Sequence, residues 1–138
     1  MGYGSNCFRG YRRRINGDRM TESIEDIYQS IIEISQSKVV TGLKIIEKTV
    51  SVLKVRLYFY EELFVQIYIN LKRQKRSYAL ILNDKRIFGK DYTFGQWHLH
   101  PFDNPDEHDK SDFAKKSISI NEFIEEAFFI LSKKLKII

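Results

Sequence analysis

All three histidines of the chain, His98, His100 and His108, lie within eleven positions, in a segment that reads GQWHLHPFDNPDEH. If residues 97–100 are extended, His98 and His100 project from the same face of the strand. Pro101 favours that conformation, because the residue before a proline is pushed away from helical geometry. A second proline stiffens the chain that returns toward His108. The segment therefore presents two imidazoles together and brings back a third.

This histidine cluster suits three different roles. Imidazoles that titrate near pH 7 can serve as the general base that activates a ribose 2′-hydroxyl and as the general acid for the leaving oxygen. The carboxylates of the same segment can orient a histidine and raise its pKa. Asp91, a few residues before Trp97, can also orient a histidine, or it can be a turn residue. The histidines can instead hold a divalent metal such as Zn²⁺, although their spacing matches no zinc motif closely. They can also simply brace a loop. We favour acid–base chemistry without a cofactor and keep metal binding at His98, His100 and His108 as the alternative.

Phosphate contacts are expected from a basic loop at residues 72–76. The loop holds Lys72, Arg73, Lys75 and Arg76. A solvated connection between two strands is the other interpretation of this loop. Trp97 is a candidate platform for stacking a nucleic-acid base, although a packing role under the loop is more usual for such a residue.

The net charge of +5 is distributed unevenly along the chain. Residues 1–20 contain five arginines and one aspartate, which gives +4, so the remaining residues carry only +1. We expect a flexible basic arm over residues 1–20 that can contact phosphates, followed by a single domain over residues 21–138. The single Cys7 excludes an internal disulfide. No apolar run is long enough for a membrane span, so a cytoplasmic protein is expected.

Hydrophobic periodicity predicts a helix, several antiparallel strands and a second helix. The expected elements are a helix over 23–36, strands over 50–59, 63–71, 77–82 and 86–88, and a helix from 119 onward. Ser23 with Asp26, and Ser119 with Glu122, form capping patterns. Residues 38–48 fit either a strand or a short helix.

This order favours an α+β fold, in which an antiparallel sheet of about four strands packs against an N-terminal and a C-terminal helix. A slip in the alternation between Leu53 and Lys54 is interpreted as a bulge. The tyrosines, Tyr78 among them, are expected on the less buried face of the sheet.

The segment from Lys90-Asp91 to His108 resembles the small archaeal and bacterial proteins of the TumE-like toxin class, which belongs to type II toxin–antitoxin pairs. The resemblance rests on Trp97-His98-Leu99-His100-Pro101-Phe102-Asp103-Asn104-Pro105 and on His108. By position, the histidines match those of the class, and Asp91 matches the aspartate of its basic-aspartate element. The Asp-Asn pair of the class reads Asp91-Tyr92 here.

The resemblance implies a toxin that pairs with a cognate antitoxin protein and acts on RNA. In this hypothesis His98 or His100 is the general base, His108 is the general acid, and Asp91 orients an imidazole. The phosphate backbone is held by Lys72, Arg73 and Arg76. The alternative is a metal-binding or non-enzymatic interaction module, possible as a homodimer through the exposed edge of the sheet.

Overall fold

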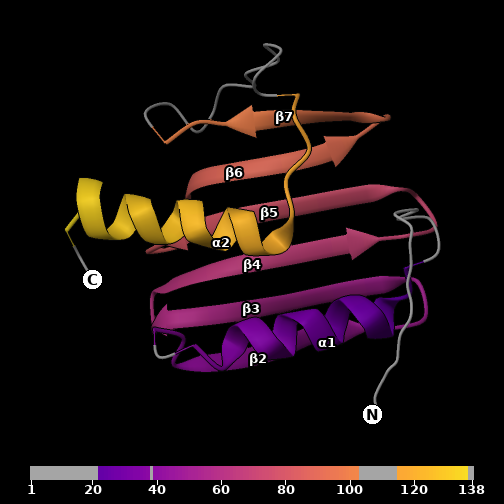
Figure 1. The fold of residues 1–138 in the computed structure, drawn as a ribbon, viewed down its shortest axis with the longest axis horizontal. Helices are drawn as coiled ribbons and strands as arrows, with labels where there is room; N and C mark the ends of the chain where they lie inside the picture. Colours follow the sequence, from indigo (N-terminus) through magenta and orange to yellow (C-terminus); the bar gives the residue numbers. More distant parts are fainter. Residues whose placement is uncertain (1–21, 38, 103–114, 137–138) are drawn as a thin grey trace.

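A six-stranded antiparallel sheet forms the centre of the fold, and its strands follow one another in chain order from β2 to β7 (Figure 1). The structure is a computed structural model, which describes residues 22–37, 39–102 and 115–136. The strands are β2 (Gly42–Lys48), β3 (Val52–Tyr60), β4 (Leu63–Asn70), β5 (Lys75–Leu82), β6 (Lys85–Thr93) and β7 (Gln96–His100). The helices are α1 (Ile24–Ser35) and α2 (Ile120–Phe129), and a π-helical turn, η3 (Ile130–Lys134), continues α2.

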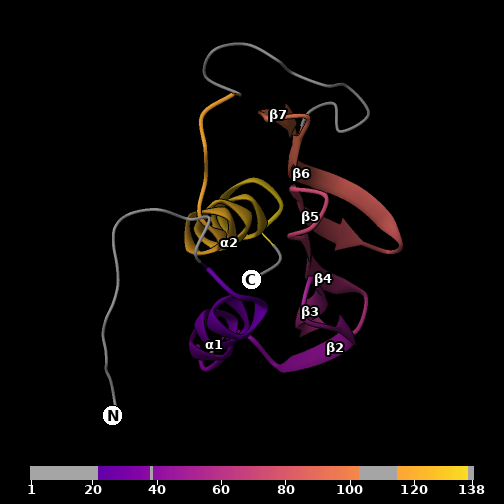
Figure 2. The ribbon, with the colours of Figure 1, turned by 90° about the vertical axis from the view of Figure 1, so that its right-hand side faces the viewer.

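Both helices pack on one face of the sheet, and no described helix lies on the other face, as Figure 2 shows edge-on. The α+β class and the antiparallel sheet are confirmed, and the described helices precede and follow the strands as predicted. We call the side without a described helix the open face. Because side chains on a strand alternate between the two sides of a sheet, every second residue of each strand points to the open face.

The expected sheet of about four strands is corrected to six. The ambiguous residues 38–48 contribute β2, in which all positions but one are exposed, so that no alternation of burial is visible. The predicted short strand over 86–88 extends over residues 85–93, and residues 96–100 of the expected loop form β7. Gly89, Lys90 and Asp91 interrupt the apolar pattern of β6, so the sequence does not reveal the full length of this strand.

The expected bulge between Leu53 and Lys54 is also corrected, because the alternation in β3 is regular at this point. The inward-facing residues of β3 are Leu53, Val55, Leu57 and Phe59, and all four are buried. Val50 and Val52 suggested the slip, but Val50 is 93% exposed and lies before the strand begins, and Val52, its first residue, faces away from the core. The pairing of β3 with β4 is irregular between Tyr58 and Tyr60. The pairing with β2 is irregular on the β2 side, between Ile45 and Glu47, opposite Val55 and Lys54.

The two predicted helix starts are confirmed in detail. The Asp26 backbone N–H donates to Ser23 Oγ at 3.1 Å, and the Ser23 N–H donates to the Asp26 carboxylate at 3.2 Å. Ser119 and Glu122 repeat this reciprocal capping box, with distances of 3.0 and 2.8 Å. Each box satisfies backbone donors that a helix start would leave unpaired. Within residues 22–37, 39–102 and 115–136, neither helix has the length and apolar composition to cross a membrane.

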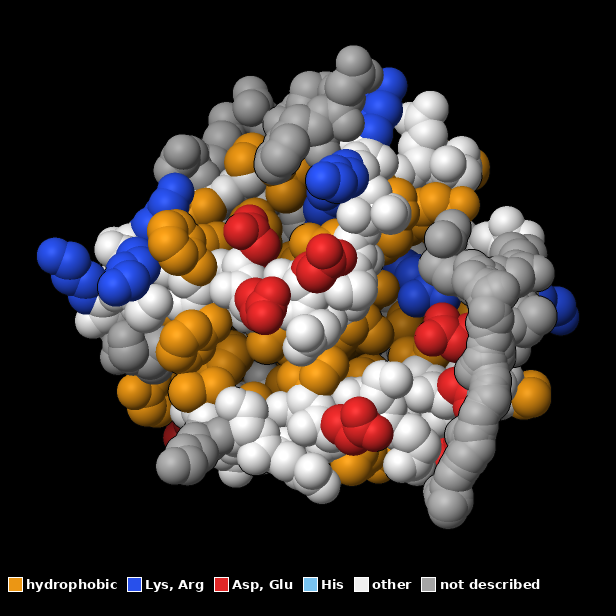
Figure 3. Space-filling model, viewed as in Figure 1, with side chains coloured by type: hydrophobic (Ala, Val, Ile, Leu, Met, Phe, Trp, Pro, Cys, Tyr) orange, Lys and Arg blue, Asp and Glu red, His pale blue; other side chains and the backbone are white. Residues whose placement is uncertain are grey.

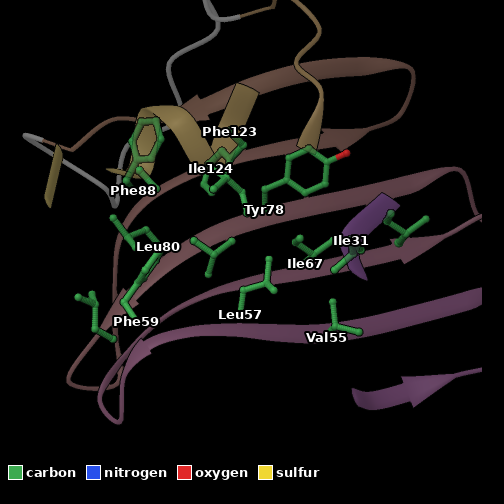
Figure 4. Packing of buried hydrophobic residues seen from close by; sticks show 14 of the residues in the cluster. Ile31, Val55, Leu57, Phe59, Ile67, Tyr78, Leu80, Phe88, Phe123 and Ile124 are labelled. Carbon is green, nitrogen blue, oxygen red and sulfur yellow. The ribbon is translucent and has the colours of Figure 1, made fainter. Parts of the chain in front are cut away.

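The core lies between the sheet and the helices, and its aromatic centre is Phe123 of α2 (Figure 4). The Phe123 ring stacks on Phe88 with centroids 5.2 Å apart and tilts against Tyr78 at 5.7 Å. Tyr78, expected on the less buried face, is only 1% exposed. The reason is its register, since it stands opposite Ile67 of β4 and therefore faces the helices.

Replacing Phe123 by alanine is expected to lower the free energy of unfolding by about 3–5 kcal/mol, because it opens a cavity between α2 and the sheet. Urea denaturation followed by circular dichroism measures the change. Phe128→Ala is the matched control on the same helix, since Phe128 is 37% exposed. The control should lose about 1 kcal/mol or less. Equal losses in the two variants would contradict this placement of the core.

Candidate active site on the open face

The hairpin of β6 and β7 brings Asp91, His98 and His100 together on the open face. Its two-residue turn, Phe94–Gly95, has positive φ angles of 51° and 75°, as in a type I′ turn. This turn fixes a register in which Asp91 stands directly opposite His98, and Gly89 stands opposite His100. Asp91 also pairs with Ser77, the neighbour of the inward-facing Tyr78, so this row of side chains lies on the open side. The prediction that the two histidines share a face is confirmed.

The Oδ2 atom of Asp91 lies close to both imidazoles. His100 Nε2 lies 3.0 Å from Asp91 Oδ2, and His98 Nε2 lies 3.8 Å from the same oxygen. The ring centroids of the two histidines are 5.7 Å apart. The three side chains are largely sheltered, with exposed fractions of 8% for His100, 12% for His98 and 16% for Asp91. Ligand atoms of all three lie within 4.8 Å of one another.

Arg86 and Ser77 hold the carboxylate from the other side, and the sequence did not point to either residue. Asp91 Oδ1 accepts hydrogen bonds from Arg86 Nη2 at 2.7 Å and from Ser77 Oγ at 2.8 Å. Arg86 Nη1 also donates to Oδ2 at 3.3 Å. The contact of Ser77 with Asp91 could be predicted once the register of β5 and β6 is known, because the two residues are paired. The contact of Arg86 could not be predicted from the sequence, because its position depends on an irregularity of that pairing at Leu80/Ile81.

The absence of a side chain at Gly89 allows Arg86 to reach Asp91. A Cβ atom built on Gly89 would overlap the guanidinium of Arg86, which therefore lies across the glycine backbone. An arginine side chain normally moves aside easily, but here two hydrogen bonds to Asp91 fix its end. Gly89 is thus a positioning residue for the Arg86–Asp91 pair, and this explains a glycine in the middle of a strand.

Asp91 is held in its ionised form. Burial raises the pKa of its carboxyl group, but the hydrogen bonds and charge of Arg86 and the hydrogen bond of Ser77 outweigh this effect and lower the pKa below its usual value. A carboxylate only accepts hydrogen bonds, so the proton between Asp91 and His100 belongs on Nε2 of the imidazole. In a neutral His100 this tautomer makes Nδ1 the basic nitrogen. The arrangement is that of a carboxylate that orients a histidine base.

The other predicted site residues lie elsewhere. Arg76 and Trp97 face the helices, where they line a pocket of about 550 Å³ between α1 and the start of α2. Arg76 lies 3.5 Å from Glu22, and the Trp97 ring packs against Tyr78 with centroids 5.8 Å apart. The sheet therefore separates both residues from Asp91.

The remaining predictions fall on the β4–β5 turn or outside the described residues. Lys72 and Arg73 are exposed in that turn, and Lys75 begins β5 and lines the same pocket. His108 and the arm over residues 1–20 lie outside the described residues. Of the predicted catalytic residues, the structure therefore brings together Asp91, His98 and His100.

Comparison with known proteins identifies no relative: the chain matches no protein-family model, no curated protein and no solved structure. The fold and the site therefore take no function from a relative, and the resemblance of residues 90–108 to the TumE-like class stays a prediction. The geometry itself supplies an ionised carboxylate, a guanidinium that balances its charge, and two sheltered imidazoles on the open face.

The lowered pKa of Asp91 predicts a pH-dependent contribution to stability. Because the folded-state pKa lies below the unfolded value of about 3.9, the ionised carboxylate stabilises the fold above about pH 4. This stabilisation is lost as the pH falls through the folded-state pKa. Asp91→Asn should therefore reduce the free energy of unfolding by about 1–3 kcal/mol at neutral pH, and the deficit should shrink in acid.

Chemical denaturation at a series of pH values between neutrality and acid measures this deficit. Asp84→Asn, in the exposed turn between β5 and β6, is the matched control, and its stability profile should follow that of the parent protein. A deficit in Asp91→Asn that stays constant down to strong acid would show that the charge of Asp91 does not stabilise the fold.

Proposed function

We propose that this protein is a toxin component of a type II toxin–antitoxin pair that cleaves RNA by histidine acid–base chemistry without a metal. The observation that carries the proposal is the contact between ionised Asp91 and His100, 3.0 Å long and placed on the open face. A carboxylate that fixes the tautomer of an imidazole is a recurrent device for making a histidine a better general base.

The proposed reaction needs no external reactant. A histidine base takes the proton from a ribose 2′-hydroxyl, and the 2′-oxygen forms a bond to the adjacent phosphorus while the bond from phosphorus to the 5′-oxygen breaks. The contact with Asp91 favours His100 as the base, with His98 beside it as the alternative. His108 is proposed as the general acid that protonates the leaving 5′-oxygen. The products are a cyclic 2′,3′-phosphate and a free 5′-hydroxyl.

The toxin part of the proposal rests on the resemblance of residues 90–108 to the TumE-like class. The resemblance also implies a cognate antitoxin protein and a cytoplasmic site of action. Expression of the chain alone should arrest bacterial growth, and co-expression of a small DNA-binding protein encoded by a neighbouring gene should restore it. Unchanged growth on expression of the folded protein would contradict the assignment as a toxin.

A metal centre is the second candidate, and the convergence of ligand atoms of Asp91, His98 and His100 within 4.8 Å favours it. Two histidines and a carboxylate can hold a divalent cation such as Zn²⁺. The charge balance argues for the metal-free state. Arg86 already neutralises Asp91 from 2.7 Å, so a divalent cation would add two uncompensated charges to a sheltered site next to a guanidinium.

Single replacement of His98, His100 or Asp91 by alanine should reduce RNA cleavage, because each removes a part of the proton-transfer apparatus. For a lost general base the expected reduction in rate is about 100- to 10,000-fold. Phe94→Ala is the control on the same hairpin, since Phe94 is 94% exposed at the turn, and it should keep full activity. Cleavage by all three site variants at the parent rate would refute the assignment of the site.

Elemental analysis of the protein purified without a histidine tag separates the two candidates. We expect much less than one equivalent of metal, and cleavage that persists in the presence of a chelator. One tightly bound equivalent, together with activity that a chelator removes and Zn²⁺ restores, would establish the metal centre instead.

A further inference from the structure

The open face of β2, β3 and β4 carries a net positive charge. The cations Lys44, Lys54 and Arg56 stand there against the single acid Glu47. The helix side carries charges of both signs, and Figure 3 shows acidic side chains in red and lysines and arginines in blue on it. Its acids are Glu25, Asp26 and Glu33 in α1 and Glu122, Glu125 and Glu126 in α2, and η3 adds the cations Lys133 and Lys134. A polyanion is therefore attracted to this part of the open face.

Two continuous rows of side chains cross the open face and end at the histidines. One row runs through Lys54, Tyr68, Ser77, Asp91 and His98, and the other runs through Arg56, Gln66, Ala79, Gly89 and His100. With strands about 4.8 Å apart, each row spans about 19 Å from β3 to β7. A single strand of a few nucleotides can follow such a path. Lys54 and Arg56 lie at its β3 end, and the candidate catalytic residues lie at the other end, where Arg86 is paired with Asp91.

Arg56 is fixed in position on this face. Its guanidinium lies over the Phe64 ring at 4.7 Å, and its Nε donates a hydrogen bond to Gln66 Oε1 at 3.0 Å. A guanidinium held in one orientation loses less entropy when it binds a phosphate. Phe64 is in turn packed against Tyr58, with ring centroids 5.0 Å apart. These contacts hold the cation ready at the surface and do not neutralise its charge.

Aromatic rings stand among these cations. Tyr68 lies next to Lys54 in the same row and is half-buried. Its hydroxyl accepts a hydrogen bond from Asn70 Nδ2 at 3.1 Å, which steadies the ring. Aromatic side chains on a flat sheet, interleaved with cations, are the usual means by which proteins stack the bases of unpaired strands. A duplex keeps its base faces covered and would gain nothing from such a ring.

We propose that the open face binds single-stranded nucleic acid, which crosses from β3 to β7 with its phosphates at Lys54 and Arg56 and a base stacked on Tyr68. The path delivers the strand to His98 and His100, and this last step alone rests on the proposed function. The open face thus restricts the substrate to unpaired strands of nucleic acid. Binding on the face requires no chemistry at the histidines.

Fluorescence anisotropy with an uncleavable probe tests the binding. The probe is a labelled 2′-O-methyl oligoribonucleotide, used as a single strand and as a duplex with its complement, with a deoxyribose strand of the same sequence for comparison. The full chain should bind both single strands and bind the duplex more weakly. Tyr68→Ala should raise Kd about 5- to 150-fold, and Lys54→Gln should lower the slope of log Kd against log salt by about 0.7.

Lys133→Gln is the matched control, because Lys133 is an exposed cation in η3 on the helix side, and it should leave binding unchanged. Preference of the parent chain for the duplex, absence of binding to single strands, or equal weakening by the control would overturn the proposal. The parent measurements need no variant, so a folding defect in Tyr68→Ala does not prevent the test.

The same variants separate this inference from the proposed function. His100→Ala that binds the probe normally but no longer cleaves RNA supports both. Normal cleavage by His100→Ala with weakened binding by Tyr68→Ala overturns the proposed chemistry and keeps the binding face. Loss of cleavage in His100→Ala with parent-like binding and cleavage in Tyr68→Ala and Lys54→Gln overturns the binding face and keeps the chemistry.

Discussion

The alternation of side chains along antiparallel strands is the constraint on which the structure depends. Adjacent residues are sent to opposite sides of one sheet, so Tyr78 enters the core while Ser77 reaches Asp91. The same rule sends Trp97 toward the helices and His98 toward the open face. The core is therefore built from one set of positions and the candidate site from the other. A shift in register by one residue would exchange the two sets and destroy both.

Elements with a strong hydrophobic periodicity or a clear capping pattern were predicted correctly from the sequence. The inward-facing residues of β4 alternate without interruption, and the helix starts carry capping boxes at Ser23 and Ser119, so these elements were predictable. β2 could not be identified, because an edge strand with little buried surface shows no contrast between its two sides. β6 was predicted too short, because Gly89 and Asp91 interrupt its apolar pattern for the benefit of the site.

The candidate site was predictable to the extent that it is local. His98 and His100 share a face because they stand two positions apart on a strand, with Leu99 between them, and Pro101 indicated that strand. Arg86 was not predictable, because its contact with Asp91 needs an irregular strand pairing and a close passage over the backbone, and neither leaves a pattern in residue types. Its guanidinium nevertheless keeps the carboxylate of the candidate site ionised, because it lowers the pKa of Asp91 and balances its charge.

The tight turn at Phe94–Gly95 has a consequence for how the site assembles during folding. Asp91 and His100 are only nine residues apart in sequence, so their contact closes a short loop at small entropic cost. Hairpins of this kind form within about 1–10 μs, long before helices separated by most of the chain can dock. The contact of Asp91 with the two histidines is thus a property of one hairpin, whereas the hydrogen bond from Ser77 and the position of Arg86 depend on the pairing of this hairpin with β5. The two imidazoles and their carboxylate can therefore come together before the strand that holds the carboxylate from the other side is in place.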